Sequence, residues 1–201
     1  MRRHDFYTRI RQSLGPLNQG QVDGFEVLQG HLSGAPQRPV PLSHAAYLLA
    51  TAWHESAHTM QPVRETLASS DAQAIARLEA AWRNGRLPQV KRPYWRPDAQ
   101  GRSWFGRGYV QLTHQVNYRK AGALIGVDLL SDPDLALDAD IAAQILIQGC
   151  QSGLFTGRRL ADYLPGDWIG ARRVINGSDR AQPIATLASA IYAALREGYP
   201  T

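Results

Sequence analysis

Cysteine is almost absent from this chain of 201 residues, since Cys150 is the only one. A single cysteine excludes the internal disulfide framework that stabilises many small secreted domains. Lysine is nearly as scarce, and only Lys91 and Lys120 contribute it to the 22 basic residues. No apolar run approaches the length of a membrane span, and none follows the charged start of the sequence. We therefore expect no stable membrane insertion and no signal peptide.

The charge balance is positive, with a formal net charge of +5 at pH 7. Such a field favours an anionic partner, and nucleic acid, lipopolysaccharide, teichoic acid and peptidoglycan would all satisfy it. The arginines are scattered singly or in pairs instead of being gathered in one stripe, so charge alone does not choose among these partners. The length and a hydrophobic content of 44% fit one globular domain.

Apolar residues recur with a helical period along most of the chain, which predicts a mainly α protein. Val22, Phe25, Leu28 and Leu32 mark an early helix, and Ser43 is a candidate N-cap for the next one. The further helices are expected at residues 44–58, 71–83, 114–125, 139–152, 167–175 and 183–196. Prolines and glycines break the pattern at residues 86–108, among several aromatic residues. This segment predicts a loop or short hairpin that forms a substrate wall.

The motif His54-Glu55-Ser56-Ala57-His58 admits two interpretations. Two histidines one helical turn apart, with a glutamate between them, form the zinc site of many metallopeptidases. Glu79 lies at about the distance where some of these enzymes have a third ligand. However, Gln61 and Arg64 occupy the positions of the glycine and third histidine of another zinc motif.

The second interpretation of the motif is a glycosidase with two carboxylates. Leu48, Ala52 and Glu55 share one helical stripe near a helix end, and both burial and the helix dipole favour the neutral carboxyl that a general acid needs. Glu65 follows beyond a break at Pro62 and is a candidate base. Inverting glycosidases hold the two carboxyls roughly 6.5 to 9.5 Å apart. A solvated Glu55 and a salt-bridged Glu65 remain the structural alternatives.

Four segments resemble glycoside hydrolase family 19, the family of plant class I and II chitinases and of many phage and prophage endolysins. Residues 54–56 resemble its His-Glu-Thr/Ser motif, and residues 105–118 resemble its long second signature. Residues 126–135 are similar to the segment that follows, and residues 174–177 to the late Ile-Asn-Gly motif. Together they cover about residues 43–180. The disulfides of the plant enzymes are impossible here.

The resemblance implies a lysozyme-like, two-lobed helical domain with a cleft, and hydrolysis by a single displacement with inversion. One catalytic domain would span residues 1–201, with residues 1–40 as a helical segment packed on the core. Glu55 would be the acid, Glu65 the base, and Thr113 would hold the attacking water. The candidate sugar contacts are His54, Gln111, Asn117 and Asn176, with Tyr94 and Trp104 as aromatic faces. The three amides could equally be structural hydrogen bonds, and the two aromatics could belong to the core.

Peptidoglycan is the favoured substrate, chitin remains open, and no metal or cofactor is expected. The expected protein is a monomer that binds glycan strands and no nucleic acid. It would be made in the cytoplasm without a signal peptide and would act on the cell wall after release, through a holin if it is phage-encoded. Delivery as a bacterial toxin would leave a similar sequence. A zinc peptidase and a noncatalytic sugar-binding protein are the rival functions.

Overall fold

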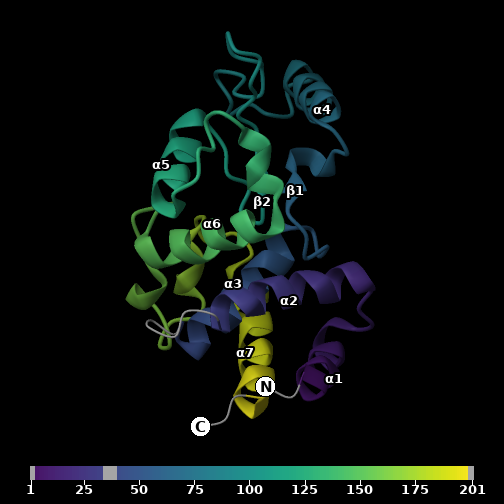
Figure 1. Cartoon of the computed structure of the whole chain (residues 1–201), viewed down its shortest axis with the longest axis vertical. Coiled ribbons are helices and arrows are strands. Elements are labelled where there is room, and N and C mark those ends of the chain that lie inside the picture. The colour runs from purple at the N-terminus through teal and green to yellow at the C-terminus, as the bar shows by residue number, and fades with distance from the viewer. Residues whose placement is uncertain (1–2, 34–39, 199–201) are drawn as a thin grey trace.

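The computed structural model describes residues 3–33 and 40–198, and these residues are mainly helical, as predicted (Figure 1). The α-helices are α1 (Arg3–Leu14), α2 (Gln19–Ser33), α3 (Leu42–Glu55), α4 (Asp71–Arg83), α5 (Gln115–Ile125), α6 (Ala139–Ser152) and α7 (Ala181–Gly198). The 3-10 helices are η1 (Glu65–Leu67), η2 (Pro133–Leu137), η3 (Leu160–Asp162) and η4 (Gly170–Val174). Strands β1 (Val63–Arg64) and β2 (Arg107–Gly108) pair in an antiparallel sheet.

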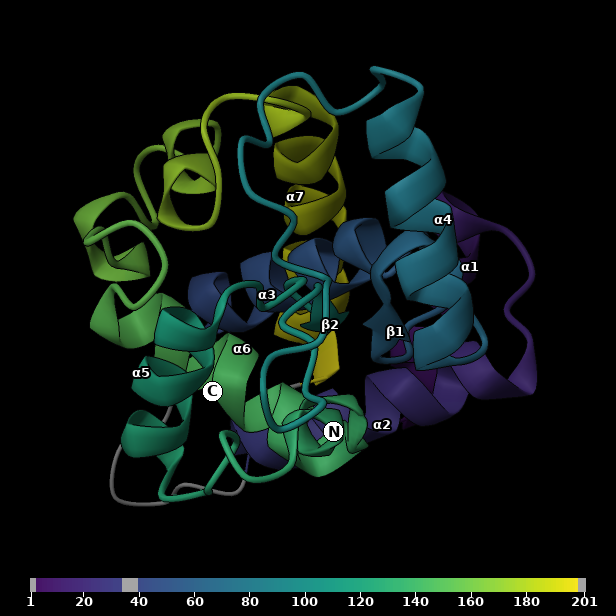
Figure 2. The ribbon, with the colours of Figure 1, turned by 90° about the horizontal axis from the view of Figure 1, so that it is seen from above.

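The larger hydrophobic core surrounds α3, which is buried from Ser43 to Trp53. The helices α1, α2, α6 and α7 pack around it and bury large side chains such as Phe6, Phe25 and Leu146. Each such side chain contributes about 1.5 to 3 kcal/mol when it leaves water. The view from above shows α7 crossing α3 (Figure 2). The end of α3, which carries Glu55, is therefore anchored in the most heavily packed part of the described chain.

A smaller core lies at the opposite end of the long axis from α1 and α7, beside α4 (Figure 1). Its buried members are Ala68, Ala74, Leu78, Trp95 and Phe105. The expected aromatic wall at residues 86–108 is thus largely wrong, because Trp95 and Phe105 point into this core and are fully buried. The two cores form two lobes, and β1 and β2 lie between them (Figure 1).

Two helices were predicted with both ends correct, because their end signals are local. Ser70 caps α4 by accepting a hydrogen bond from the backbone of Gln73, and Asp138 caps α6 in the same way. Gly153 ends α6 in the left-handed conformation with φ 82°, which glycine adopts without strain.

The structure corrects two other helical predictions. Helix α3 begins at Leu42 after Pro41, so Ser43 lies inside the helix and is not its N-cap. The helix also ends at Glu55 instead of residue 58, and His58 has φ 68°. The helix expected at residues 167–175 is only the 3-10 helix η4.

No helix in the described part of the chain is long and apolar enough to cross a membrane.

Candidate active site

Glu65 is the better fixed of the two candidate catalytic carboxylates. It follows β1 directly, and its backbone N–H donates to the carbonyl of Gly106 over 2.7 Å. In return, the backbone N–H of Gly106 donates to Glu65 Oε2 over 2.7 Å, and the Tyr94 hydroxyl donates to Oε1 over 2.8 Å. Both carboxylate oxygens therefore have a donor that fixes their orientation and stabilises negative charge.

Tyr94 was predicted as an aromatic face for a sugar, and the structure shows its hydroxyl engaged with Glu65. Burial and the neighbouring Glu65 carboxylate both raise the pKa of Tyr94. Its hydroxyl thus stays protonated at neutral pH and remains a hydrogen-bond donor. This contact with the candidate base was not foreseen in the sequence, because 29 residues separate the two side chains.

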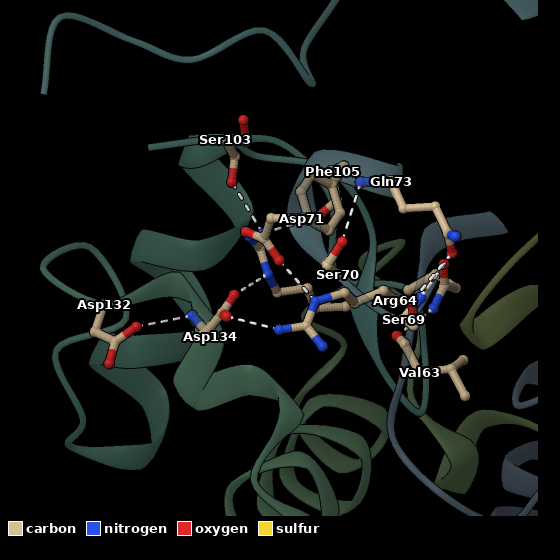
Figure 3. Close-up of polar contacts among 12 residues, drawn as sticks. Val63, Arg64, Ser69, Ser70, Asp71, Gln73, Ser103, Phe105, Asp132 and Asp134 are labelled. Atoms are coloured by element: carbon tan, nitrogen blue, oxygen red, sulfur yellow. Dashed lines mark hydrogen bonds and ion pairs between the residues drawn. The ribbon is translucent and has the colours of Figure 1, made fainter. Parts of the chain in front are cut away.

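Four charged side chains next to Glu65 form a closed network (Figure 3). Arg64 contacts Asp71 at 2.6 Å and Asp134 at 2.8 Å. Arg107 contacts the same two carboxylates at 2.6 and 2.7 Å. The sequence left open a salt bridge to Glu65. Arg64, its neighbour, pairs with Asp71 and Asp134 instead of forming it. The network connects β1, β2, α4 and η2. It surrounds the pair of strands whose first member, β1, ends directly before Glu65.

Arg107 is the buried centre of this network, with a side chain that is 2% exposed. It also donates to the Ser103 carbonyl over 2.9 Å and to the Tyr118 hydroxyl over 3.1 Å. Its guanidinium lies 3.8 Å from the centre of the Phe105 ring. A planar group with five donors suits this site, and lysine could not replace it fully.

The segment after β2 connects Thr113 to the strand that leads to Glu65. Gln111 donates from Nε2 to the Val63 carbonyl over 3.0 Å, and the Thr113 hydroxyl donates to the Gln111 carbonyl over 2.6 Å. Asn117 donates from Nδ2 to the Thr113 carbonyl over 2.8 Å. Gln111 and Asn117 therefore both serve the structure of this turn. A Cβ atom at position 106 would lie 2.7 Å from Gln111 Oε1, which explains the glycine there.

The same turn lines a cavity of about 170 Å³. Its lining residues are Val110, Gln111, Leu112, Thr113, Asn117, Leu154, Phe155 and Ile175. Three of the predicted site residues thus meet at one hollow, next to the late motif that contains Asn176. Asn176 itself is exposed and accepts a hydrogen bond from the backbone of Gly177.

Glu55, the candidate acid, lies at the last position of α3 and contacts Arg172 of η4. The two side chains are 2.5 Å apart, with 17% of the Glu55 side chain and 4% of the Arg172 side chain exposed. Arg172 also donates from Nε to the Asp179 carbonyl over 2.9 Å. Burial and the helix end are the surroundings of Glu55 that the sequence indicated, and the structure adds this direct contact with a guanidinium. Arg172 was missed because it lies 117 residues from Glu55, and its position two residues before the late motif was the available signal.

Trp104 does not present a face to substrate. Its side chain is only 6% exposed and packs against Tyr118 at 5.3 Å between ring centres. The sequence assigned it to the sugar site because tryptophan stacks well on sugars, but here its large apolar area is buried in the core.

The two histidines of the 54–58 motif do not lie one turn apart on a helix, which the zinc interpretation requires. His58 lies beyond the end of α3 and stacks on Trp53, with ring centres 5.1 Å apart and planes 13° apart. Glu79, the proposed third ligand, is engaged by Trp95 at 3.0 Å and by Arg96 at 2.8 Å. Among the described residues, no group of three or more His, Cys, Asp or Glu side chains could hold a metal ion.

The sequence profile of the family described as "Chitinase class I" matches residues 84–148, which include the long signature and β2. Chitinase 2 of Oryza sativa subsp. japonica is 55% identical over 51 residues, which are 25% of this chain and 15% of the rice protein. Endochitinase 2 of Solanum tuberosum is 56% identical over 73 residues, which are 36% of this chain and 23% of the potato protein. These matches support the resemblance of the chain to glycoside hydrolase family 19. The chain matches less than a quarter of the length of these two plant relatives.

Two solved structures of family 19 share the fold over most of the chain. A bacterial family 19 chitinase aligns with a TM-score of 0.58 at 22% identity, over 94% of this chain and 93% of that one. Chitinase C from Streptomyces griseus HUT6037 aligns with a TM-score of 0.56 at 18% identity, over 94% of this chain and 74% of that one. The predicted helical, lysozyme-like family 19 fold is thereby confirmed.

Proposed function

We propose that this chain is an inverting glycoside hydrolase that cleaves β-1,4 bonds between N-acetylated amino sugars, with peptidoglycan as its substrate. The observation that carries the proposal is the Glu65 carboxylate. It is held by two donors and is joined to Thr113 through the backbone and side chain of the family signature. A carboxylate held in one orientation by two donors suits the base that a single displacement by water requires.

Glu65 and Thr113 would share the attacking water. The Thr113 hydroxyl donates a hydrogen bond to the Gln111 carbonyl, so its oxygen is left to accept a hydrogen bond. Water could then donate one proton toward Glu65 and the other toward Thr113, which directs its lone pair at the anomeric carbon. The carboxylate takes the first proton as the new C–O bond forms.

Glu55 would protonate the leaving oxygen on the other face of the sugar. It enters this step as the neutral acid and leaves it as a carboxylate. Arg172, which contacts Glu55 directly, would then stabilise the negative charge that proton donation creates. Solvent water then takes the proton from Glu65 and supplies one to Glu55, which completes the cycle.

Peptidoglycan is favoured over chitin because of charge. Its peptide stems carry carboxylates, and the chain has a net charge of +5. Chitin is the second candidate, because the relatives in plants and bacteria are named chitinases.

Product analysis separates these functions. The protein is incubated with purified peptidoglycan and with colloidal chitin, and the fragments are identified by mass spectrometry, with Glu55→Gln as the inactive control. Cleavage between sugars of peptidoglycan supports the proposal, and cleavage of chitin alone supports the second candidate. Cuts within the peptides, or between sugar and peptide, would exclude a glycosidase.

A further inference from the structure

An open groove lies beside the acid, between the end of α1, the end of α3 and the first half of α7. Its volume is about 690 Å³, within the range of pockets that bind small ligands. Its lining residues are Ser13, Leu14, Trp53, His54, His58, Gln182, Pro183, Ile184, Thr186, Leu187 and Ala190. Most of this wall is apolar.

One of the groove's lining residues, His54, directly precedes Glu55 at the end of α3. Burial lowers the pKa of His54, and the nearby cations Arg172 and Arg180 act in the same direction, against the effect of Glu55. His54 is therefore neutral at neutral pH, while the guanidinium of exposed Arg180 supplies a permanent positive charge close by.

The rest of the 54–58 motif builds one wall of this groove. His58 stacks on Trp53, and Gln21 holds the turn by donating from Nε2 to the His58 carbonyl over 2.9 Å. The two histidines are thus lining residues of one hollow, although they are not arranged as ligands of one metal ion.

An enzyme that cleaves peptidoglycan has to accommodate peptide stems, which chitin lacks. Every second sugar carries a peptide stem, attached through a lactyl ether. Whichever glycosidic bond is cut, one of the two sugars that flank it carries a stem, and this stem has to lie near the acid or the base. The stem begins with methyl-bearing lactyl and alanyl groups and continues with carboxylates.

We propose that this groove receives the lactyl-peptide stem of the sugar next to the cleaved bond. The inference rests on the proposed function and assigns the part of the substrate that distinguishes peptidoglycan from chitin. The apolar wall of Leu14, Leu187 and Ala190 suits the methyl groups. Arg180 is exposed two positions before the lining residue Gln182, and its guanidinium suits the carboxylates beyond the methyl groups. A larger hollow of about 790 Å³ between α2 and α6 includes neither a candidate catalytic residue nor a sequence neighbour of one.

Two variants on α7 test the groove without touching the catalytic groups. Thr186→Glu adds a negative charge to its wall, and Ala190→Phe fills it. Ser189→Glu is the matched control, because Ser189 is exposed on the same helix and does not line the groove. Each protein is assayed on uncrosslinked peptidoglycan strands, on the same strands after an amidase has removed the stems, and on chitin hexasaccharide.

Both groove variants should lose about tenfold in kcat/KM on stem-bearing strands, the size expected when a few contacts are lost or opposed. Their activity on stripped strands and hexasaccharide should stay unchanged, which also shows that they fold, and Ser189→Glu should match the wild type throughout. Equal losses on all three substrates, or no loss on stem-bearing strands, would overturn the groove assignment and leave the glycosidase intact. A wild type that cuts only hexasaccharide would refute the peptidoglycan substrate and the groove assignment with it.

Discussion

Replacing Arg107 by alanine tests the charged network that holds β1 and β2 together beside Glu65. Arg107 is buried and contacts Asp71 and Asp134 at 2.6 and 2.7 Å. Breaking a buried ion pair by removing one partner typically costs about 3 to 5 kcal/mol. The two carboxylates are 38% and 44% exposed and keep Arg64 as a partner, so water and Arg64 offset part of this loss.

We therefore expect Arg107→Ala to lower the free energy of unfolding by about 2 to 3 kcal/mol, just below the range for fully buried pairs. For a protein of this size, each kcal/mol shifts Tm by about 2 to 4 °C, which gives a fall of roughly 5 to 10 °C. Arg107→Lys keeps the charge without the planar fork and should lose about half as much. Turnover should also fall, because the adjacent Gly106 orients Glu65.

Thermal and urea unfolding at pH 7 measure these changes, with Arg83→Ala as the control. Arg83 pairs with Glu79 at 3.0 Å, but its side chain is 72% exposed. An exposed pair of this kind contributes about 0.5 kcal/mol or less. If Arg107→Ala cost no more than Arg83→Ala, the network would not be stabilising the strand pair, and the reasoning would fail.

Four further predictions concern the chemistry and the small lobe. Glu55→Gln should keep the fold and reduce turnover by about 10²- to 10⁴-fold, so retention of more than a tenth of wild-type activity would argue against Glu55 as the acid. The losses from Glu65→Gln and Thr113→Ala should be far from additive, because both act on one water, and NMR of early product should show an inverted anomer; additive losses or a retained anomer would mean a different base. Activity should survive EDTA, and His58→Ala should be mild, whereas loss in EDTA with recovery on adding zinc would restore the peptidase. Hydrogen bonds from Arg96 and Trp95 lower the pKa of Glu79 from 4.5 to about 2, so its stabilising effect is present above about pH 4.5 and is lost as the pH falls toward 2. The Tm difference between wild type and Glu79→Gln should shrink over that interval, and a constant difference would contradict this origin.

Local signals in the sequence were sufficient for several elements of the fold. The helices at residues 71–83 and 139–152 were predicted with both ends correct. In the structure Ser70, Asp138 and Gly153 end these helices through backbone groups within one turn of themselves. The capping signal failed at Ser43, where packing around α3 places the helix start earlier, and the late segment forms only η4.

The candidate site was partly predictable for the same reason. Residues 105–118 are contiguous and run through β2, a turn and the start of α5, so the sequence alone grouped Gln111, Thr113 and Asn117. The structure places all three at one cavity. Their roles with substrate remain predictions. The position of Trp104 was wrong, because aromatic character does not distinguish a core residue from a cleft residue.

The sequence by itself determined the helical class, and it indicated the family resemblance and the two candidate carboxylates, since these depend on residue types at short spacings. Only the tertiary structure decided what surrounds those carboxylates. Arg172 reaches Glu55 across 117 residues, and Tyr94 reaches Glu65 across 29. The end of α3 at Glu55, with His58 turned onto Trp53, likewise decided between a zinc motif and the wall of a groove. Contacts between distant segments depend on how the helices pack, and the period of a single helix does not specify that packing.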